Sequence, residues 1–252
     1  MFEYVLFDLD GTLGDPYEGI TNCIKYALSS VGITEENPEK LKSYIGPPLR
    51  KTFAKYGFDE DMCEVLTAKY RELFDVSGIH QSVMYPEAAE MLKALHEHGV
   101  KIALASCKPE HACEIILEEY GVLKYFDAVV GATLDKTLDS KPEIIKVALS
   151  RLGYGKKTHE HAVMVGDRDM DMLGAHENGI AAVGAVYGYG GEAELRSAGA
   201  DYIINSPAQL LEIVLGARFE HARLCFEHGL GRRVSTVLKA APSAASGHNQ
   251  QH

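Results

Sequence analysis

The sequence predicts an α/β protein built on a doubly wound parallel sheet, Rossmann-like in arrangement, with a helical cap domain inserted after the first strand. Two observations lead to this fold class. From residue 86 onward, segments with helical periodicity alternate with short apolar runs, which is typical of parallel strands joined by crossover helices. Between residues 16 and 81, by contrast, one helical pattern follows another and no strand pattern is evident.

Each element follows from a local pattern. The first strand is predicted at residues 4–7, a continuous apolar run that suits the centre of a parallel sheet. Four helices separated by glycine and proline breaks are predicted next, at residues 17–31, 38–44, 49–56 and 59–75. The later strands are predicted at residues 101–105, 128–130, 162–165, 181–186 and 202–204. The later helices are predicted at residues 86–98, 109–120, 142–152, 169–178 and 207–215.

These patterns divide the chain into three parts. We expect a core at residues 1–15 and 82–215, a helical cap at residues 16–81 and a C-terminal extension at residues 216–252. The extension has room for one more helix within residues 217–239. Its last part is rich in Ala, Ser, Gly, Asn, Gln and His, so we expect it to be disordered.

Composition narrows the class of partner. The chain has 25 Lys and Arg against 36 Asp and Glu, a formal net charge of −11, which argues against nucleic-acid binding. No apolar run approaches the roughly 20 residues of a membrane span, and the amino-terminal residues lack a secretory pattern. The five cysteines form no Cys-x-x-Cys pair, so we expect free thiols in the cytoplasm. A monomer and a homodimer are both compatible with the sequence.

Polar residues follow several predicted strands, and ligands of such sheets bind beyond the carboxyl ends of the strands. Asp8 and Asp10 follow the first strand, and Asp167 follows the strand at 162–165. Asp171, four residues after Asp167, is expected on the same helical face. So many carboxylates in one pocket need a cation, and an all-oxygen ligand set favours Mg²⁺.

Three further residues are candidates for binding a phosphoryl group. Ser106 offers a hydroxyl at a strand end, and Cys107 offers its backbone N–H. Lys141, at the start of a predicted helix, supplies an ammonium group that can neutralise phosphate and hold a carboxylate ionised.

Four segments together resemble the motifs of the haloacid dehalogenase-like (HAD) hydrolase superfamily. They are Asp8-Leu9-Asp10-Gly11-Thr12-Leu13, Ser106, Lys141-Pro142 and Gly166-Asp167-Arg168-Asp169-Met170-Asp171. The resemblance covers residues 1 to about 215, and the helical insertion looks like a type 1 cap. Within the superfamily the chain is most similar to the phosphoglycolate phosphatase-like branch. Two segments resemble a subgroup described as 5′-nucleotidase-like: Gly11-Thr12-Leu13-Gly14-Asp15-Pro16 and Ile45-Gly46-Pro47-Pro48-Leu49.

This resemblance implies a mechanism. Asp8 would attack phosphorus and form an aspartyl-phosphate, and Asp10 would act as acid and then base while its backbone carbonyl binds Mg²⁺. Asp8, Asp10 and Asp167 would be the metal ligands, with Asp171 behind them or on a metal-bound water. Ser106 and Lys141 would hold the phosphoryl group. The resemblance thus implies a Mg²⁺-dependent phosphatase of small phosphomonoesters, of the phosphoglycolate or nucleoside 5′-monophosphate class.

Other functions stay open at this point. A phosphomutase similar to β-phosphoglucomutase, a protein phosphotyrosine phosphatase and a receiver-like phospho-acceptor share parts of the same residue set. In the cap, Arg50 and Tyr17 are candidates for choosing the leaving group. For Lys108 a surface position is favoured over one that lines the site, and the glycine-rich residues 187–191 are predicted to be a flexible loop.

Overall fold

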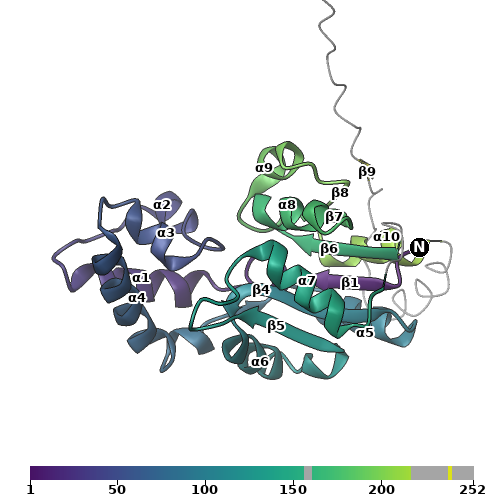
Figure 1. The fold of residues 1–252 in the computed structure, drawn as a ribbon, viewed down its shortest axis with the longest axis horizontal. Coiled ribbons are helices and arrows are strands. Elements are labelled where there is room, and N and C mark those ends of the chain that lie inside the picture. Colours follow the sequence, from purple (N-terminus) through teal and green to yellow (C-terminus); the bar gives the residue numbers. More distant parts are fainter. Residues whose placement is uncertain (156–160, 217–237, 240–252) are drawn as a thin grey trace, which may run out of the picture.

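The computed structural model describes residues 1–155, 161–216 and 238–239 (Figure 1). These residues form a seven-stranded sheet flanked by helices, and a separate group of helices lies beyond the ends of its strands. The predicted fold class is therefore confirmed. No helix in the described ranges combines the length and apolar character of a membrane span. The helix predicted within 217–237 and the predicted disorder of 240–252 lie outside the described residues.

The large sheet is wound in two directions from its centre. Its strands are β1 (Tyr4–Phe7), β4 (Lys101–Pro109), β5 (Ala128–Ala132), β6 (Ala162–Gly166), β7 (Ala181–Ala185), β8 (Tyr202–Ile204) and β9 (Leu238–Lys239). Their spatial order is β5-β4-β1-β6-β7-β8-β9. The chain builds from β1 out to β5 and then returns to β6 on the other side of β1, so winding reverses beside β1. Ligands of doubly wound sheets bind at such a reversal.

All neighbouring pairs from β5 to β8 are parallel, whereas β9 pairs antiparallel with β8. A helix extending to residue 239 was therefore the wrong expectation for these last two residues. Two residues are too few to show the alternation from which a strand is predicted.

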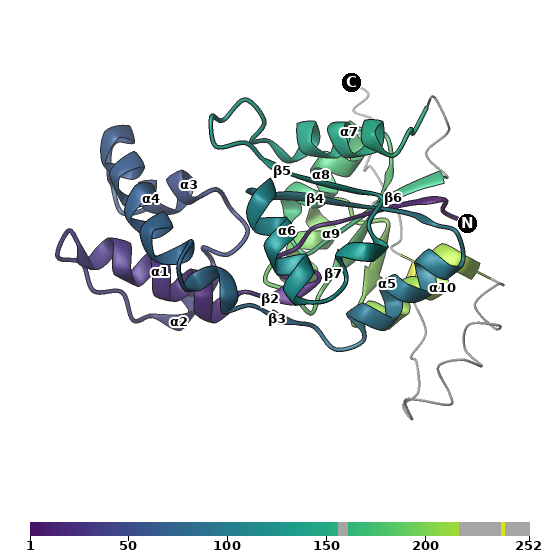
Figure 2. The ribbon, with the colours of Figure 1, turned by 90° about the horizontal axis from the view of Figure 1, so that it is seen from below.

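Helices cover both faces of the sheet (Figure 2). One face carries α5 (Ala88–Glu97), α6 (Glu110–Glu119) and α10 (Leu210–Leu215), and the other carries α7 (Lys141–Arg151), α8 (Asp169–Glu177) and α9 (Gly191–Ser197). Short 3-10 helices lie at η1 (Gly78–His80), η2 (Leu123–Tyr125) and η4 (Pro207–Gln209). Side chains alternate along β1, so Val5 and Phe7 pack on the first face and Leu6 on the second. Both faces are buried, which explains why β1 is apolar throughout.

The inserted helices are α1 (Tyr17–Ser29), α2 (Pro38–Lys42), α3 (Leu49–Ala54) and α4 (Glu60–Phe74). In α4 the side chain of Asp59 accepts a hydrogen bond from the Met62 backbone N–H at 2.9 Å and so caps the helix. Leu66, Tyr70 and Phe74, spaced by four, form its buried face, and α4 packs against α1. This spacing made the helix visible in the sequence.

A short ribbon joins the inserted helices to the sheet. Strand β2 (Gly14–Asp15) pairs antiparallel with β3 (Val83–Met84), with Gly14 opposite Met84 and Asp15 opposite Val83. The ribbon was not predicted, because two-residue strands carry no periodicity. It holds the segment that enters the inserted helices beside the segment that leaves them, at the carboxyl ends of the strands of the large sheet.

Candidate active site

Asp8 directly follows β1 at the carboxyl end of this central strand. Its backbone N–H donates to the Val165 carbonyl oxygen at 2.9 Å, which continues the pairing with β6. Its Oδ1 accepts a hydrogen bond from the Leu9 N–H at 2.8 Å, and its Oδ2 lies 3.0 Å from Lys141 Nζ. The carboxylate of this buried residue is therefore oriented from both sides.

Lys141 is the first residue of α7, and its side chain is only 1% exposed. Its Nζ lies 3.0 Å from Asp8 Oδ2 and 2.9 Å from Asp171 Oδ1, and it donates to the Ala105 carbonyl oxygen at 3.0 Å. Burial disfavours the charged ammonium, but the attraction of Asp171 and Asp8 outweighs burial and holds the pKa of Lys141 well above its usual range. The residue is thus a fixed positive charge beside Asp8.

Asp167 follows β6, next to β1, and is buried against a glycine loop. Its Oδ2 accepts a hydrogen bond from the Tyr189 N–H at 2.8 Å. A Cβ on Gly188 would lie 2.4 Å from the Asp167 Cβ, and a Cβ on Gly11 would lie 2.1 Å from Asp167 Oδ2. The loop predicted at 187–191 is present up to Gly190, but its backbone packs on Asp167 and orients it, so the expectation of a merely flexible segment needs correction.

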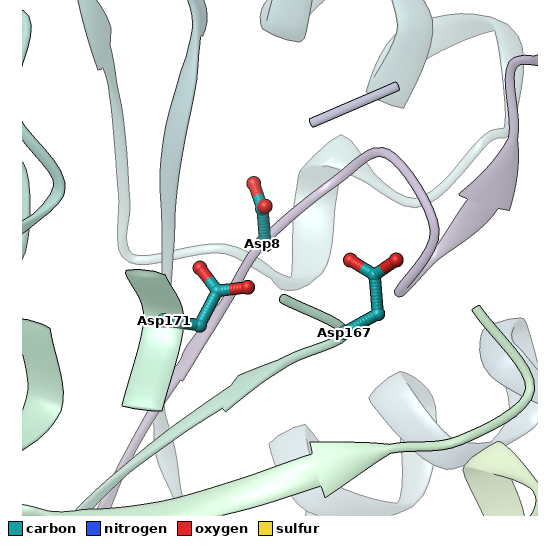
Figure 3. Close-up of side chains that lie close together, drawn as sticks. All are labelled: Asp8, Asp167 and Asp171. Carbon is teal, nitrogen blue, oxygen red and sulfur yellow. The ribbon is translucent and has the colours of Figure 1, made fainter. Parts of the chain in front are cut away.

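Asp171 completes a group of three buried carboxylates with Asp8 and Asp167. One oxygen from each lies within 4.8 Å of the other two, and the three side chains stand around the ends of β1 and β6 (Figure 3). Asp171 Oδ2 accepts a hydrogen bond from the Arg168 N–H at 3.1 Å, in the first turn of α8. A Cβ on Gly166 would lie 2.2 Å from Asp171 Cγ, so this glycine permits the approach.

The structure corrects the reason for which Asp167 and Asp171 were expected together. Helix α8 begins at Asp169, so Asp167 lies before the helix and the two side chains share no helical face. They meet because the first turn of α8 folds back over the end of β6. Asp169, between them in sequence, is exposed.

Three carboxylates at this spacing fit a divalent cation. Burial, together with repulsion from Asp171 and Asp8, raises the pKa of Asp167 well above its usual range. Burial raises the pKa of Asp171 to about 6, although Lys141 opposes the shift. Two like charges 4 Å apart repel by about 4 kcal/mol at an effective dielectric constant of 20, and a cation removes this cost. Oxygen ligands alone suit a hard divalent ion.

The side chain of Asp10 turns away from this group. Its Oδ2 lies 2.9 Å from Lys108 Nζ, while its buried Oδ1 has no hydrogen-bond partner in the described structure. Burial raises the pKa of Asp10, although Lys108 opposes the shift. A carboxyl group with a raised pKa is suited to proton transfer.

Lys108 was predicted on the surface, and that prediction was wrong. Its side chain is 7% exposed, and its ammonium lies 4.6 Å from the centroid of the Phe74 ring at the end of α4. The sequence carries no signal for this contact, because Phe74 comes from the inserted helices. Lys108 therefore contacts both Asp10 and the inserted helices.

Ser106 and Cys107 lie in β4, the other neighbour of β1. The register places Leu104 opposite Phe7, so Ser106 lies near the level of Asp8 at the strand ends. Ser106 is buried, and its Oγ accepts a hydrogen bond from the Lys108 N–H at 3.3 Å. Burial raises the pKa of the Cys107 thiol to about 11, so the thiol is neutral at pH 7.

A cleft of about 230 Å³ lies between the inserted helices and the strand ends. Asp10, Cys107 and Lys108 form part of its wall, and Arg50 from α3 forms another part. Arg50 Nη2 lies 3.0 Å from Asp139 Oδ2, across the cleft in the loop before α7. Tyr17 does not line the cleft, and its backbone N–H donates to Asp15 Oδ1 at 2.9 Å.

Comparison with known proteins agrees with this fold and site. A family model described as haloacid dehalogenase-like hydrolase matches residues 5–185. The 5′-nucleotidase of Pseudomonas aeruginosa is 40% identical over 194 residues, 77% of this chain and 86% of that protein. The phosphoglycolate phosphatase of Vibrio parahaemolyticus is 32% identical over 219 residues, 83% of this chain and 95% of that protein. The crystal structure of a predicted phosphatase from Clostridium acetobutylicum has a TM-score of 0.81 and 38% identity, covering 85% of this chain and 99% of that chain.

A doubly wound sheet with buried carboxylates at its winding reversal defines a class of α/β enzymes that hold their ligands at the strand ends. The chain belongs to the haloacid dehalogenase-like hydrolase family. The resemblance drawn from the four sequence segments is thereby confirmed.

Proposed function

We propose that this hydrolase cleaves small phosphomonoesters by way of an aspartyl-phosphate on Asp8. The enzyme is a phosphoric monoester hydrolase. The observation that carries the proposal is the setting of Asp8: a buried carboxylate at the winding reversal, 3.0 Å from the buried ammonium of Lys141 and grouped with Asp167 and Asp171. The family match and the phosphatase names of the relatives support the same reaction.

In the first half-reaction, an Asp8 carboxylate oxygen attacks phosphorus and the bond from phosphorus to the leaving oxygen breaks. Asp10 donates its proton to that oxygen, so the leaving group departs as a neutral alcohol. Lys141, joined by Ser106 and the Cys107 N–H, neutralises the phosphoryl oxygens as charge builds on them.

In the second half-reaction, water attacks the phosphorus of the aspartyl-phosphate. Asp10, now ionised, takes the proton from that water, and the bond from phosphorus to Asp8 breaks to release inorganic phosphate. Splitting the transfer into two steps is the advantage of a covalent nucleophile. Asp10 ends the cycle protonated, as it began.

We assign Mg²⁺ as the cofactor, which would be held by the carboxylates of Asp8 and Asp167 and by the backbone carbonyl of Asp10, with Asp171 behind them. The metal supplies positive charge for the phosphoryl oxygens and for the crowded carboxylates. The carboxylate donor set supports this assignment, since Mg²⁺ prefers oxygen ligands and is bound through few carboxylates.

We propose that residues 1–15 and 82–215 form the catalytic core, that residues 16–81 form the cap, and that residues 216–252 are an extension. The β2–β3 ribbon joins core and cap next to these boundaries. Substrates are of the phosphoglycolate or nucleoside 5′-monophosphate class, and the protein acts in the cytoplasm as a monomer or homodimer. The free thiols of Cys23, Cys63, Cys107 and Cys113 support a reducing compartment.

A phosphate-release assay over a panel of phosphorylated metabolites tests the reaction, with Mg²⁺ and with EDTA. We expect release that needs the metal and falls by about 10⁴-fold in Asp8→Asn. Asp169→Asn is the matched control, since it changes an exposed carboxylate of the same segment and should keep activity. Acid quenching during turnover should trap phosphate on Asp8.

Three results would count against this function. The first is full activity in Asp8→Asn, and the second is unchanged activity in EDTA. The third is conversion of a sugar phosphate to its isomer without phosphate release, which would instead indicate a phosphomutase.

A further inference from the structure

One cation of the cleft, Arg71, forms no ion pair or hydrogen bond through its side chain among the described residues, although its charge helps to lower the pKa of Glu64 in the same wall. In the described part of the chain, four Lys and Arg side chains line the cleft. Three of them form ion pairs: Arg50 with Asp139 at 3.0 Å, Lys108 with Asp10 at 2.9 Å and Lys136 with Glu64 at 2.5 Å. The fourth, Arg71, forms no ion pair or hydrogen bond through its side chain within the described residues.

Arg71 lies in the last turn of α4 and is half-buried. Its wall of the cleft also contains Tyr70 and Phe74, which are buried, and Phe74 in turn contacts Lys108 beside Asp10. A single cleft therefore joins the proposed acid and base to this guanidinium. Because Asp10 and Arg71 line the same cavity, a ligand that reacts next to Asp10 can extend its remote end toward Arg71.

Asp75, one helical turn beyond Arg71 in the cleft wall, also forms no ion pair within the part of the chain that the structure describes. Residues four apart on a helix can pair, yet no ion pair joins these two side chains. Asp75 is exposed, so solvent satisfies its carboxylate. The attraction of Arg71 to Glu64 acts without direct contact, and Glu64 is itself paired with Lys136, so the guanidinium can still donate hydrogen bonds to an acceptor from outside the chain.

We propose that Arg71 is a specificity-determining residue that binds a second anionic group, carried by the leaving group of the substrate. This rests on the proposed phosphatase function and narrows its substrate class. The preferred substrates are small phosphomonoesters with a carboxylate or a further phosphate at the end remote from the reacting phosphorus. Both groups accept the two parallel hydrogen bonds that a guanidinium donates.

Arg50, one of the two candidates named from the sequence for choosing the leaving group, already has a partner. Its guanidinium already contacts Asp139 at 3.0 Å. A substrate anion there would have to displace that carboxylate and leave it unpaired. Arg71 requires no such exchange, so it is the better receptor.

The test uses two pairs of compounds that differ only in the second anion. One pair is glycerol 3-phosphate and 3-phosphoglycerate, which isolates a carboxylate. The other is glucose 1-phosphate and glucose 1,6-bisphosphate, which isolates a phosphate. We expect the wild-type enzyme to prefer the doubly anionic member of at least one pair by about 10- to 100-fold in kcat/KM, the range for hydrogen bonds to a charged group.

Arg71→Ala should abolish that preference, mainly by raising KM, and change kcat/KM for the singly anionic compounds by less than about threefold. Arg71→Lys should keep part of the preference, because it retains the charge without the planar fork. Lys136→Ala is the matched control: it removes one cleft cation that is already paired with Glu64, so it should leave the preference intact. Circular dichroism checks that each variant is folded.

The inference is overturned if the wild type shows no preference in either pair, if Arg71→Ala keeps the preference, or if Lys136→Ala or Arg50→Ala removes it equally. In each of these cases phosphate is still released, so the proposed function stands. If no phosphate is released from any of these compounds, from p-nitrophenyl phosphate or from nucleoside monophosphates, the proposed function fails and takes the inference with it.

Discussion

Lys141→Met is the most informative single change, because it removes a buried charge and keeps most of the side-chain volume. The ammonium lies 3.0 Å from Asp8 Oδ2 and 2.9 Å from Asp171 Oδ1. At an effective dielectric constant of 20, the Coulomb attraction of each contact is about 5.5 kcal/mol. The variant no longer has to desolvate an ammonium, so the net loss is smaller. We expect the free energy of unfolding to fall by about 3–5 kcal/mol, as when one partner of a buried pair is removed.

The assay is reversible urea unfolding followed by circular dichroism, in EDTA so that no metal compensates. A loss of this size lowers the midpoint by about 1–2 M for slopes near the upper end of the usual range. The loss in the free energy of unfolding caused by Lys141→Met should be larger at pH 8 than at pH 6. The buried carboxylates left without Lys141 bind protons more readily in the folded state than in the unfolded state, so folding is penalised as pH rises.

Lys25→Met is the matched control for this measurement. Lys25 also contacts a carboxylate, Glu36, at 2.7 Å, but the two side chains are 35% and 70% exposed. Surface pairs of this kind contribute at most about 1 kcal/mol. If Lys141→Met costs no more than Lys25→Met, the argument that Lys141 balances two buried carboxylates is refuted.

Three further predictions concern the metal, the glycine loop and the cap. A divalent ion at 100 times its Kd should raise the free energy of unfolding of the wild type by about 2.7 kcal/mol, measured in thermal melts. Asp167→Asn should lose most of this increase. If the increase is unchanged in the variant, Asp167 is not a metal ligand. Gly188→Ala adds a Cβ 2.4 Å from the Asp167 Cβ and should lower kcat/KM at least about tenfold, whereas Gly155→Ala, with open space around its Cβ, should not; equal activities would show that the loop does not orient Asp167. Hydrogen bonds from Lys40 and Tyr56 hold the pKa of Glu35 at about 2, below its usual 4.5. The contribution of ionised Glu35 to the free energy of unfolding is therefore complete above pH 4.5 and is lost as pH falls toward 2. In Glu35→Gln the melting temperature should fall less steeply between pH 5 and pH 2 than in the wild type. The same pH dependence in both proteins would contradict this role of Glu35.

Much of the core could be predicted because its signals are local. The apolar run at residues 4–7 matches β1 residue for residue, and the strand at 162–165 differs from β6 only by Gly166. Since parallel strands end at one edge of a sheet, Asp8 and Asp167 could be expected together before any coordinates were known. These inferences needed only the order of residues along the chain.

The parts that were missed depend on contacts between distant segments. Lys108 is buried because Phe74, from α4, lies over its ammonium, and nothing near Lys108 in the sequence indicates that cover. Likewise, Gly188 and Tyr189 pack on Asp167 from the end of β7, the strand beside β6, but they lie far from Asp167 in the sequence, so their glycine-rich composition indicated only a loop. The free state of Arg71 became visible only when the partners of the other cleft cations were known.

The β2–β3 ribbon has a consequence for how such enzymes diversify. Because Gly14 pairs with Met84 and Asp15 with Val83, the chain departs from the sheet and re-enters it at one spot. A segment whose two ends are adjacent can be exchanged as a module without shifting the strands that frame it. Grafting another helical insert between Asp15 and Val83 should therefore leave Asp8, Lys141 and Asp167 where they are while replacing the wall of the cleft that the inserted helices supply.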